Sequence, residues 1–480
     1  MIEVHKNLID GCWSDTTASF ETINPSDTDD VVAHCAAATV EDVRQAAAAA
    51  KHAAASWARS PIQLRQEILR ATSDELLVRK AELGRLLSRE EGKPLAEGVA
   101  EVVRAAQIFD FFAGECLRLQ GEMMASTRPS VSVEITREPV GVVGIITPWN
   151  IPLAIPAWKI APALAYGNSV VFKPAEIVSA TAWVLVDVLK RAGLPGGVLN
   201  LVMGSGATVG QTIVESDDID AVSFTGSTRT GRTIAAGCVA RMKKVQLEMG
   251  GKNPLVVLAD CHLETAVECA VNGAFFATGQ RCTASERLIV EDAIHDKFVA
   301  AVSERMGSLV VGHALADGTE IGPVASQAQL EQNLSYMDIG KQEGAVLLCG
   351  GDPLDRGTPG FYMAPALFVE ATNQMRTSRE EIFGPVASVI RVKDYDEALA
   401  LANDTEFGLS SGICTTSIKQ ATHFKRNSQA GVVAVNLPTA GADFHVPFGG
   451  TKRSSYGPRE QGRYAIEFYT TVKTAYTHAG

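Results

Sequence analysis

The chain has 480 residues, which is too long for one compact core and predicts two or three structural units. Hydrophobic residues make up 46% of the chain and charged residues 20%, the balance of an ordinary globular enzyme. The net charge of −12 and the lack of a basic run disfavour nucleic acid and anionic membranes as partners.

Nothing at the start of the sequence indicates export. Met1 to Lys6 place no apolar core behind a basic segment, so we expect no secretory signal. Residues 140–158 are uncharged and long enough to span a membrane, but their three prolines would break such a helix. The nine cysteines are odd in number and irregularly spaced. They favour free thiols in a reducing cytoplasm over a disulfide framework or a metal site.

The first 120 residues predict short strands followed by helices. Residues 9–13 and 20–24 have the pattern of small strands around turns. Thr39 and Asp42 form a capping-box pattern that opens a helix to about Trp57, and Pro61 begins a second helix. A third helix is predicted over residues 95–119.

From residue 126 onward, strand-like and helix-like segments alternate. Residues 126–137 predict a half-exposed strand, and residues 140–148 a strand buried on both faces of a parallel sheet. This alternation predicts a doubly wound α/β fold, with a second α/β series that begins near Gly250. Further strands are predicted at 169–172, 198–202, 221–224, 253–258, 286–290, 387–391, 432–436 and 464–476, and helices at 180–192, 207–215, 263–278, 293–309 and 395–403.

Two glycine-containing turns are candidates for binding a dinucleotide. Gly206 and Gly210 lie in a turn after one predicted strand, and Phe224 and Ser227 lie in a turn after the next. Glycines there let the backbone approach a pyrophosphate, whose charge a helix N-terminus favours. The alternative is that both are ordinary strand–helix turns.

Lys173 and Glu176 follow the carboxyl end of a predicted strand, where ligands of α/β sheets bind. A lysine can donate to ribose hydroxyls and a glutamate can accept from a free 2′-hydroxyl. The alternative is that both are ordinary surface residues after a turn.

Three residues have the chemistry of a nucleophilic site. Cys282 is flanked by Arg281 and Thr283, and a nearby cation would raise its thiolate fraction. Glu248 precedes paired glycines and is a candidate general base, while the rigid turn around Asn150 is suited to an oxyanion donor. The alternatives are an inert core cysteine, a strand-edge carboxylate and a turn asparagine that caps its own backbone.

Together these segments resemble one family, the NAD(P)⁺-dependent aldehyde dehydrogenases. The resemblance covers nearly the whole chain, and the spacing of 34 residues from Glu248 to Cys282 also fits the family. The matching motifs, in the family's order, are Pro148-Trp149-Asn150, Phe172-Lys173-Pro174, Phe224-Thr225-Gly226-Ser227, Leu247-Glu248-Met249-Gly250-Gly251, Gly279-Gln280-Arg281-Cys282, Glu381-Ile382-Phe383-Gly384-Pro385 and Pro447-Phe448-Gly449-Gly450.

The resemblance implies an aldehyde dehydrogenase fold in three parts. Residues 1–122 and 141–249 would form a Rossmann-like coenzyme domain, and residues 250–440 an α/β catalytic domain. Residues 123–140 and 441–480 would form a small β oligomerisation element and the C-terminal tail. It also implies a homodimer or homotetramer.

The resemblance further implies how an aldehyde becomes a carboxylic acid. Cys282 would form a thiohemiacetal and then a thioester, Asn150 would stabilise the oxyanion, and Glu248 would activate water. The cofactor would be NAD⁺, since Glu176 would repel a 2′-phosphate, with NADP⁺ as the alternative. The implied cofactor contacts are Trp149, Lys173, Glu176, Gly206, Gly210, Phe224, Ser227, Glu381 and Phe383.

The tail after Gly450 departs from the family's usual Lys-x-Ser-Gly pattern, because Ser455 replaces the glycine. This tail most resembles the subgroup that acts on 2-oxoglutarate semialdehyde. Arg281, Trp158 and Thr283 are candidate substrate contacts, with Arg281 meeting a distal carboxylate. The alternatives are that Arg281 pairs with a structural carboxylate and that Trp158 belongs to the core.

We therefore expect a short semialdehyde substrate, of 2-oxoglutarate or succinate, with aromatic aldehydes as the second choice. A CoA-acylating aldehyde dehydrogenase and a non-enzymatic member of the fold are further alternatives. The joint presence of Asn150, Glu248 and Cys282 argues against both.

Overall fold

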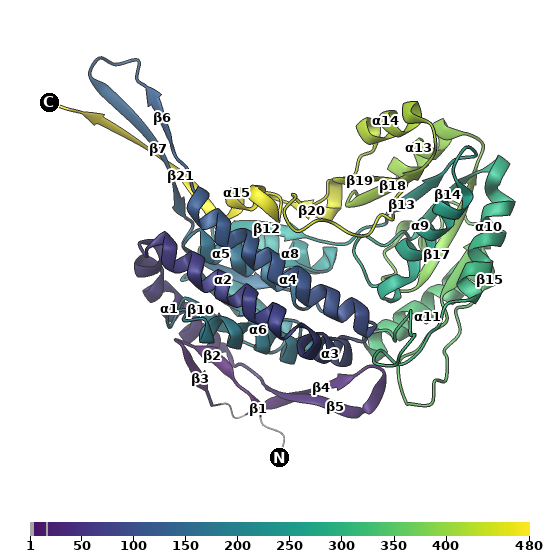
Figure 1. Ribbon diagram of the computed structural model, residues 1–480, viewed down its shortest axis with the longest axis horizontal. Coiled ribbons are helices and arrows are strands. Elements are labelled where there is room, and N and C mark those ends of the chain that lie inside the picture. The colour runs from purple at the N-terminus through teal and green to yellow at the C-terminus, as the bar shows by residue number, and fades with distance from the viewer. Residues whose placement is uncertain (1–3, 16–17) are drawn as a thin grey trace.

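The computed structural model describes residues 4–15 and 18–480, so part of the segment on which the expectation about a leader depended lies outside the described residues. Within the described part, the strands form four sheets. Two large α/β bodies lie side by side, and a thin β arm extends away from the first of them (Figure 1).

An eight-stranded sheet forms the centre of the first body, in the order β20-β12-β11-β8-β9-β10-β2-β3. Its middle strands, from β12 to β10, run parallel, and antiparallel strands close both edges. The buried strand predicted at residues 140–148 is confirmed, because every residue of β8 is buried. The strands are β2 (Asn7–Ile9), β3 (Cys12–Ser14), β8 (Val142–Ile146), β9 (Ser169–Lys173), β10 (Leu199–Leu201), β11 (Ala221–Thr225), β12 (Lys244–Glu248) and β20 (Ser455–Tyr456).

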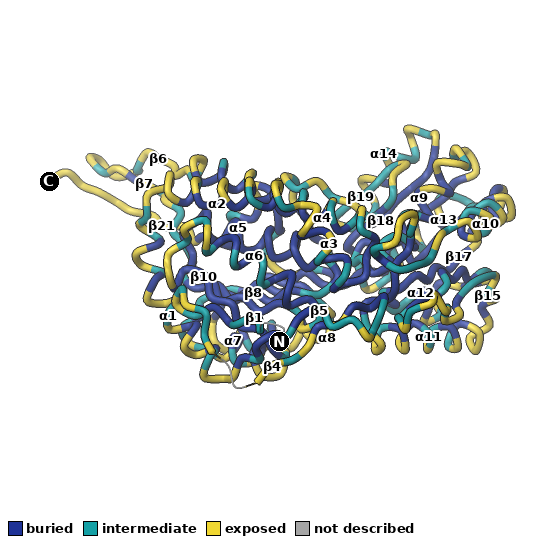
Figure 2. Tube along the Cα trace, turned by 60° about the horizontal axis from the view of Figure 1, so that its bottom comes forward, coloured by how far each residue is buried: buried dark blue, intermediate teal, exposed yellow. Residues whose placement is uncertain are grey.

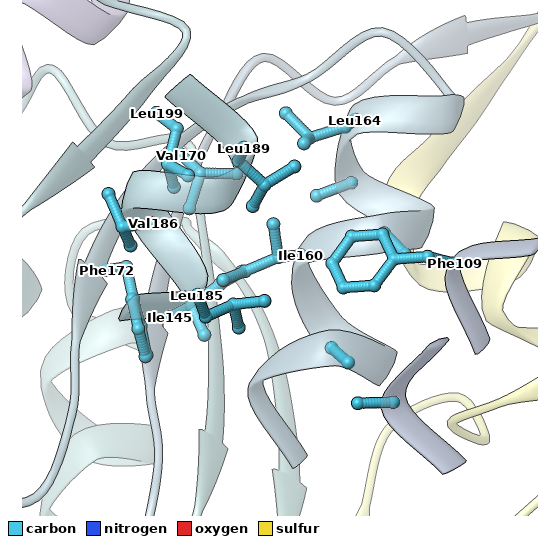
Figure 3. Packing of buried hydrophobic residues seen from close by; sticks show 14 of the residues in the cluster. Phe109, Ile145, Ile160, Leu164, Val170, Phe172, Leu185, Val186, Leu189 and Leu199 are labelled. Carbon is cyan, nitrogen blue, oxygen red and sulfur yellow. The ribbon is translucent and has the colours of Figure 1, made fainter. Parts of the chain in front are cut away.

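Helices cover both faces of this sheet. Successive residues of β8 point to opposite faces, so Val142 packs with α1, α7 and α8 while Val143 packs with α2, α4, α5 and α6. Figure 3 shows the second of these layers, where Phe109 and Ile160 meet Val170 and Leu185. The helices are α1 (Val40–Ala58), α2 (Ile62–Val78), α3 (Lys80–Glu91), α4 (Leu95–Glu115), α5 (Ala154–Ala165), α6 (Ser179–Arg191), α7 (Gln211–Glu215) and α8 (Thr228–Val239).

A seven-stranded sheet forms the second body, in the order β15-β16-β17-β14-β13-β18-β19. All its neighbours are parallel except the edge pair β15–β16. Its elements are β13 (Pro254–Val257), α9 (Leu263–Phe275), β14 (Arg287–Glu291), α10 (Asp292–Gly307), α11 (Gln327–Gln342), β15 (Val346–Cys349), β16 (Ala366–Val369), α12 (Arg376–Arg379), β17 (Val386–Val392), α13 (Tyr395–Asn403), β18 (Ser410–Cys414), α14 (Ile418–Asn427) and β19 (Val432–Val435).

The arm is a three-stranded antiparallel sheet of β6 (Glu122–Ala125), β7 (Val131–Pro139) and β21 (Thr470–His478). Large apolar side chains stay exposed on it, including Met123 at 78% and Tyr476 at 61%. Figure 2 shows the arm as largely exposed, in contrast to the buried sheets. A second small sheet, of β1 (Val4–His5), β4 (Ser19–Asn24) and β5 (Asp27–Ala36), lies at the other side of the first body.

Several sequence expectations were wrong in detail. The predicted helix over residues 95–119 ends at Glu115, where a short 3-10 turn follows. The tail predicted as strand from residue 464 begins instead with α15 (Ile466–Tyr469), so the strand starts only at Thr470. Helices α3 and α5 were not predicted. Among the described residues, no helix is long and apolar enough to cross a membrane.

Candidate active site

A pocket of about 580 Å³ contains residues from both α/β bodies and includes Cys282. It brings together six of the predicted site residues: Trp149, Asn150, Ser227, Cys282, Glu381 and Phe383. The other predicted residues do not line it, although several lie directly behind its walls. Their positions decide what each can do.

Cys282 lies on a tightly constrained segment after α9. Gly279 has a φ of +64°, and a Cβ there would stand 2.1 Å from the carbonyl oxygen of Gly384, so only glycine fits. The side chain of Asn253 then donates to the Cys282 carbonyl at 2.8 Å. These contacts hold the thiol at the pocket with little freedom.

The environment of Cys282 does not by itself favour the thiolate. Burial, together with the carboxylates of Glu381 and Glu248, raises the pKa of the Cys282 thiol to about 12, while its own backbone N–H lowers that pKa. The flanking Arg281 therefore does not create the low thiol pKa that a nearby cation would give.

The side chain of Asn150 is fixed beside the cysteine segment. It is 4% exposed, and its Nδ2 donates to the carbonyl of Gln280 at 2.9 Å. Its backbone carbonyl accepts from Nζ of Lys93 at 2.7 Å, and Lys93 pairs with Glu101 on α4 at 2.6 Å. Asn150 thus presents an amide donor next to Cys282 from a braced turn, as an oxyanion site requires.

Glu248 ends β12 and is 2% exposed. Its Oε2 accepts a hydrogen bond of 2.7 Å from Ser455, while its Oε1 is buried without a hydrogen-bond partner among the described residues. Burial and the nearby Glu460 carboxylate raise the pKa of Glu248 well above its ordinary value. The carboxyl group is therefore held behind the pocket wall, and it does not line the pocket with Cys282.

Glu381 and Phe383 form the wall that faces Trp149. The Phe383 and Trp149 rings meet edge to face, with centroids 5.4 Å apart. Glu381 accepts from the Gly251 N–H at 3.1 Å, and a Cβ on Gly250 would lie 1.8 Å from its Oε2. Burial and the Glu286 carboxylate raise the pKa of Glu381 to about 8.

Ser227 caps α8 by accepting from the Thr230 N–H at 3.3 Å, so the N-terminus of a twelve-residue helix faces the pocket. Such an end attracts a phosphate group. Phe224 is buried beneath this turn, against Gly226.

Lys173 and Glu176 lie at the end of β9, away from the pocket that holds Cys282. Gly210 adjoins Lys173, since a Cβ on Gly210 would be 3.9 Å from its Cδ, and Gly206 faces open space. Burial lowers the pKa of Lys173 to about 8, while Glu176 is exposed. Lys173 and Gly210 are thus buried next to each other past the strand end, while Glu176 and Gly206 are exposed.

The three candidate substrate contacts are all engaged elsewhere. Arg281 donates to the carbonyl of Asn272 at 2.6 Å and to that of Phe276 at 2.7 Å and 3.0 Å. Trp158 is 4% exposed and donates to Glu460 at 2.8 Å, and the Thr283 carbonyl accepts from Thr439 at 2.7 Å. This geometry gives Arg281 a structural role on backbone carbonyls, not on the carboxylate of the stated alternative, and it favours the core alternative for Trp158.

Sequence reasoning missed three residues around this centre. Glu460 forms a buried ion pair with Lys159, whose Nζ also donates to Ser223 at 2.8 Å. Arg104 lies over the Trp158 ring and contacts Gln461. Glu460 and Gln461 lie in the tail that departs from the family pattern, but that departure assigned them no role, and no local pattern pointed to Arg104.

Comparison with known proteins identifies the fold and the chemistry. The profile of the aldehyde dehydrogenase family matches residues 13–475. The chain belongs to the aldehyde dehydrogenase family. It is an NAD(P)⁺-dependent aldehyde dehydrogenase, which confirms the resemblance given by its motifs.

Among the relatives of this aldehyde dehydrogenase is alpha-ketoglutaric semialdehyde dehydrogenase of Bacillus subtilis, which is 43% identical over 98% of this chain and 97% of its own. Alpha-ketoglutarate semialdehyde dehydrogenase of Haloferax volcanii is 42% identical over 99% of both chains.

Solved structures are similar over the whole chain. NAD-dependent aldehyde dehydrogenase from Sinorhizobium meliloti has a TM-score of 0.97 at 36% identity, over 100% of this chain and 95% of its own. Betaine aldehyde dehydrogenase from Staphylococcus aureus in complex with NAD⁺ has a TM-score of 0.97 at 35% identity, over 100% and 96%. The aldehyde dehydrogenase fold is thereby confirmed.

Proposed function

We propose that this aldehyde dehydrogenase oxidises a semialdehyde with a distal carboxylate, 2-oxoglutarate semialdehyde foremost, with NAD⁺ as oxidant. The observation that carries this substrate class is the naming of two relatives, 42–43% identical over nearly their whole length, for that aldehyde. The departure at Ser455, which made the tail resemble the same subgroup, supports it independently.

The residues present fit a nicotinamide dinucleotide. The α8 N-terminus at Ser227 suits a pyrophosphate, the Glu381 carboxylate suits a ribose hydroxyl, and the Trp149 and Phe383 rings suit the nicotinamide. When bound, NAD⁺ supplies a hydride acceptor for the carbon that Cys282 attacks. Lys173, Glu176, Gly206, Gly210 and Phe224 would complete the adenosine end.

Cys282 acts as the nucleophile. Its sulfur adds to the aldehyde carbon, and the oxygen of the resulting thiohemiacetal carries the negative charge. The Asn150 amide lies beside the cysteine segment and donates to that oxygen. Once that carbon has given up its hydride, an acyl thioester would remain on the Cys282 sulfur.

Glu248 then serves as general base for hydrolysis of the thioester. It takes a proton from water, and the hydroxide attacks the acyl carbon and releases the carboxylic acid and the Cys282 sulfur. Because the carboxyl group is hydrogen-bonded to Ser455 behind the pocket wall, it must rotate toward Cys282 for this step.

We also propose the division into a coenzyme domain (1–122, 141–249), a catalytic domain (250–440), and an arm with the tail (123–140, 441–480). The exposed apolar side chains of the arm support its pairing with a second subunit in a homodimer or homotetramer. The nine free cysteines support a cytoplasmic location. Sedimentation of the purified protein tests the assembly.

The substrate assignment is tested by following the absorbance of reduced cofactor. Each semialdehyde is paired with a neutral aldehyde of the same length, with benzaldehydes added, and NAD⁺ and NADP⁺ are run in parallel. A large preference in kcat/KM for the carboxylated member with NAD⁺ supports the proposal. Equal rates on neutral or aromatic aldehydes would refute it, and turnover that requires CoA would favour the acylating alternative.

A further inference from the structure

Arg104 is a half-buried cation that no carboxylate pairs with among the described residues. Its Nε is fully buried without a hydrogen-bond partner, and among the described residues the guanidinium donates one long hydrogen bond, of 3.4 Å from Nη2 to Oε1 of Gln461. Burying an unpaired charge costs free energy, so a bound anion would stabilise the Arg104 guanidinium in this position. The guanidinium groups of Arg65, Arg281 and Arg287 instead donate several hydrogen bonds each, mostly to backbone carbonyls.

Gln461 offers a second unsatisfied donor at the same place. Its Nε2 is buried and unpartnered, and the residue is 0% exposed. Its backbone has φ 60° and ψ 166°, a region that residues other than glycine rarely adopt and that costs about 1–3 kcal/mol. Strain of this kind persists where the surrounding structure holds a side chain in a functional position.

The pair is close to the reacting thiol. Glu101, one helical turn before Arg104 on α4, accepts from the N–H groups of Leu153 and Ala154 and so fixes α4 against the turn that carries Asn150. The Arg104 guanidinium lies 5.7 Å from the centre of the Trp158 ring and interacts through charge with Cys282. Arg104 does not itself line the pocket with Cys282, so the far end of a substrate whose aldehyde carbon is at Cys282 would reach it beyond Asn150 and Trp158.

Neither of the acidic residues near Arg104 forms an ion pair with it in the described structure. Glu101 is occupied by Lys93 and by the two N–H groups of the turn. Asp443 influences Arg104 through charge but is exposed and forms no ion pair with it in the described structure. The Arg104 guanidinium can therefore pair with an anion that enters from solvent.

We propose that Arg104, with the amide of Gln461, binds the distal carboxylate of the substrate aldehyde, the role that the sequence assigned to Arg281. This inference rests on the proposed semialdehyde function and names the residues that select for it. The guanidinium supplies charged donors and Nε2 of Gln461 a neutral one, so both carboxylate oxygens are bound. The cofactor and the thioester chemistry are unaffected by this assignment.

The test compares kcat/KM for succinate semialdehyde with that for butanal, with NAD⁺ saturating. Arg104→Met keeps the packing on Trp158 but removes the charge, and the ratio of the two constants should fall by about 30-fold or more. Arg104→Lys should retain part of the ratio, because an ammonium lacks the planar fork. Arg118→Met, which removes an exposed arginine near the end of the same helix, serves as the matched control.

A second variant and a binding measurement distinguish loss of carboxylate binding from misfolding of the Arg104→Met variant. Gln461→Leu should lower the same ratio by about fivefold without changing the net charge. In the wild-type protein, we expect 2-oxoglutarate to protect Cys282 from alkylation by iodoacetamide. In Arg104→Met, the concentration of 2-oxoglutarate that gives the same protection should be at least tenfold higher. A wild-type ratio near one would overturn the semialdehyde function and this inference with it. A large wild-type ratio that survives in both variants would overturn only the role of Arg104 and Gln461.

Discussion

The hydroxyl of Ser455 donates a hydrogen bond of 2.7 Å to Oε2 of Glu248 and accepts one of 2.6 Å from the N–H of Gly450. Both hydrogen-bonding functions of the serine are therefore used to hold the proposed general base. In the family pattern that the sequence resembles, glycine is usual at this point of the tail. Ser455 is thus a positioning residue for Glu248.

Ser455→Ala should shift the pH dependence of turnover. The serine hydrogen bond lowers the pKa of Glu248, so its loss raises that pKa further above the ordinary value. A general base acts when deprotonated, so the acid limb of the kcat profile should move up by about one pH unit. Ser455→Thr, which keeps the hydroxyl, should restore the wild-type limb. A limb that stays in place in the alanine variant would contradict this role.

Asn150→Ala should lower kcat by about 10²–10³ with little change in KM, because the amide stabilises charge that develops after binding. Its Nδ2 also donates to Gln280, so loosening of the cysteine segment must be checked. The rate at which iodoacetamide alkylates Cys282 reports on that segment and should change less than threefold. A kcat within threefold of wild type would rule out the oxyanion role.

The reactivity of Cys282 without cofactor should rise steadily with pH. Its pKa of about 12 means that the thiolate fraction grows about tenfold per unit between pH 7 and 10, with no plateau. The Glu381 carboxylate raises that pKa, so Glu381→Gln should speed alkylation above about pH 8, where Glu381 is ionised, measured by mass spectrometry of the Cys282 peptide. Glu380→Gln, at the neighbouring partly exposed carboxylate, is the control. A plateau near neutral pH would show a thiolate already formed.

Glu176→Gln should relax the preference for NAD⁺. An exposed carboxylate beside Lys173 repels a 2′-phosphate, so its removal should raise kcat/KM with NADP⁺ relative to NAD⁺ by about tenfold. The comparison uses steady-state rates with both cofactors, and Glu264→Gln on α9 controls for net charge. An unchanged ratio would place the adenosine ribose elsewhere.

The sequence predicted the α/β alternation well where burial is periodic or complete, as in β8 and β9. It failed at α5, because all twelve residues of that helix are buried and no amphipathic period exists to detect. The prolines within residues 140–158 also suggested a break, although the helix contains one of them, Pro156. The start of the tail was read as strand, although α15 comes before β21.

The site residues likewise fall into those that the sequence predicted and those that it did not. Motifs located Cys282, Asn150 and Glu381 because local sequence sets their turns. They gave no means of finding where the Arg281 guanidinium goes, since its partners are carbonyls of the preceding helix. The pairing of Arg104 with Gln461 spans 357 positions along the chain, so only the folded structure reveals it.

The central claim is a thioester on Cys282 that Glu248 hydrolyses. The most direct measurement mixes the Glu248→Gln variant with 2-oxoglutarate semialdehyde and NAD⁺, quenches with acid, and analyses the peptides by mass spectrometry. We expect a burst of about one reduced cofactor per active site and an acyl adduct on Cys282 that is absent from Cys282→Ala. Continued turnover with no adduct, or an adduct on another residue, would contradict it.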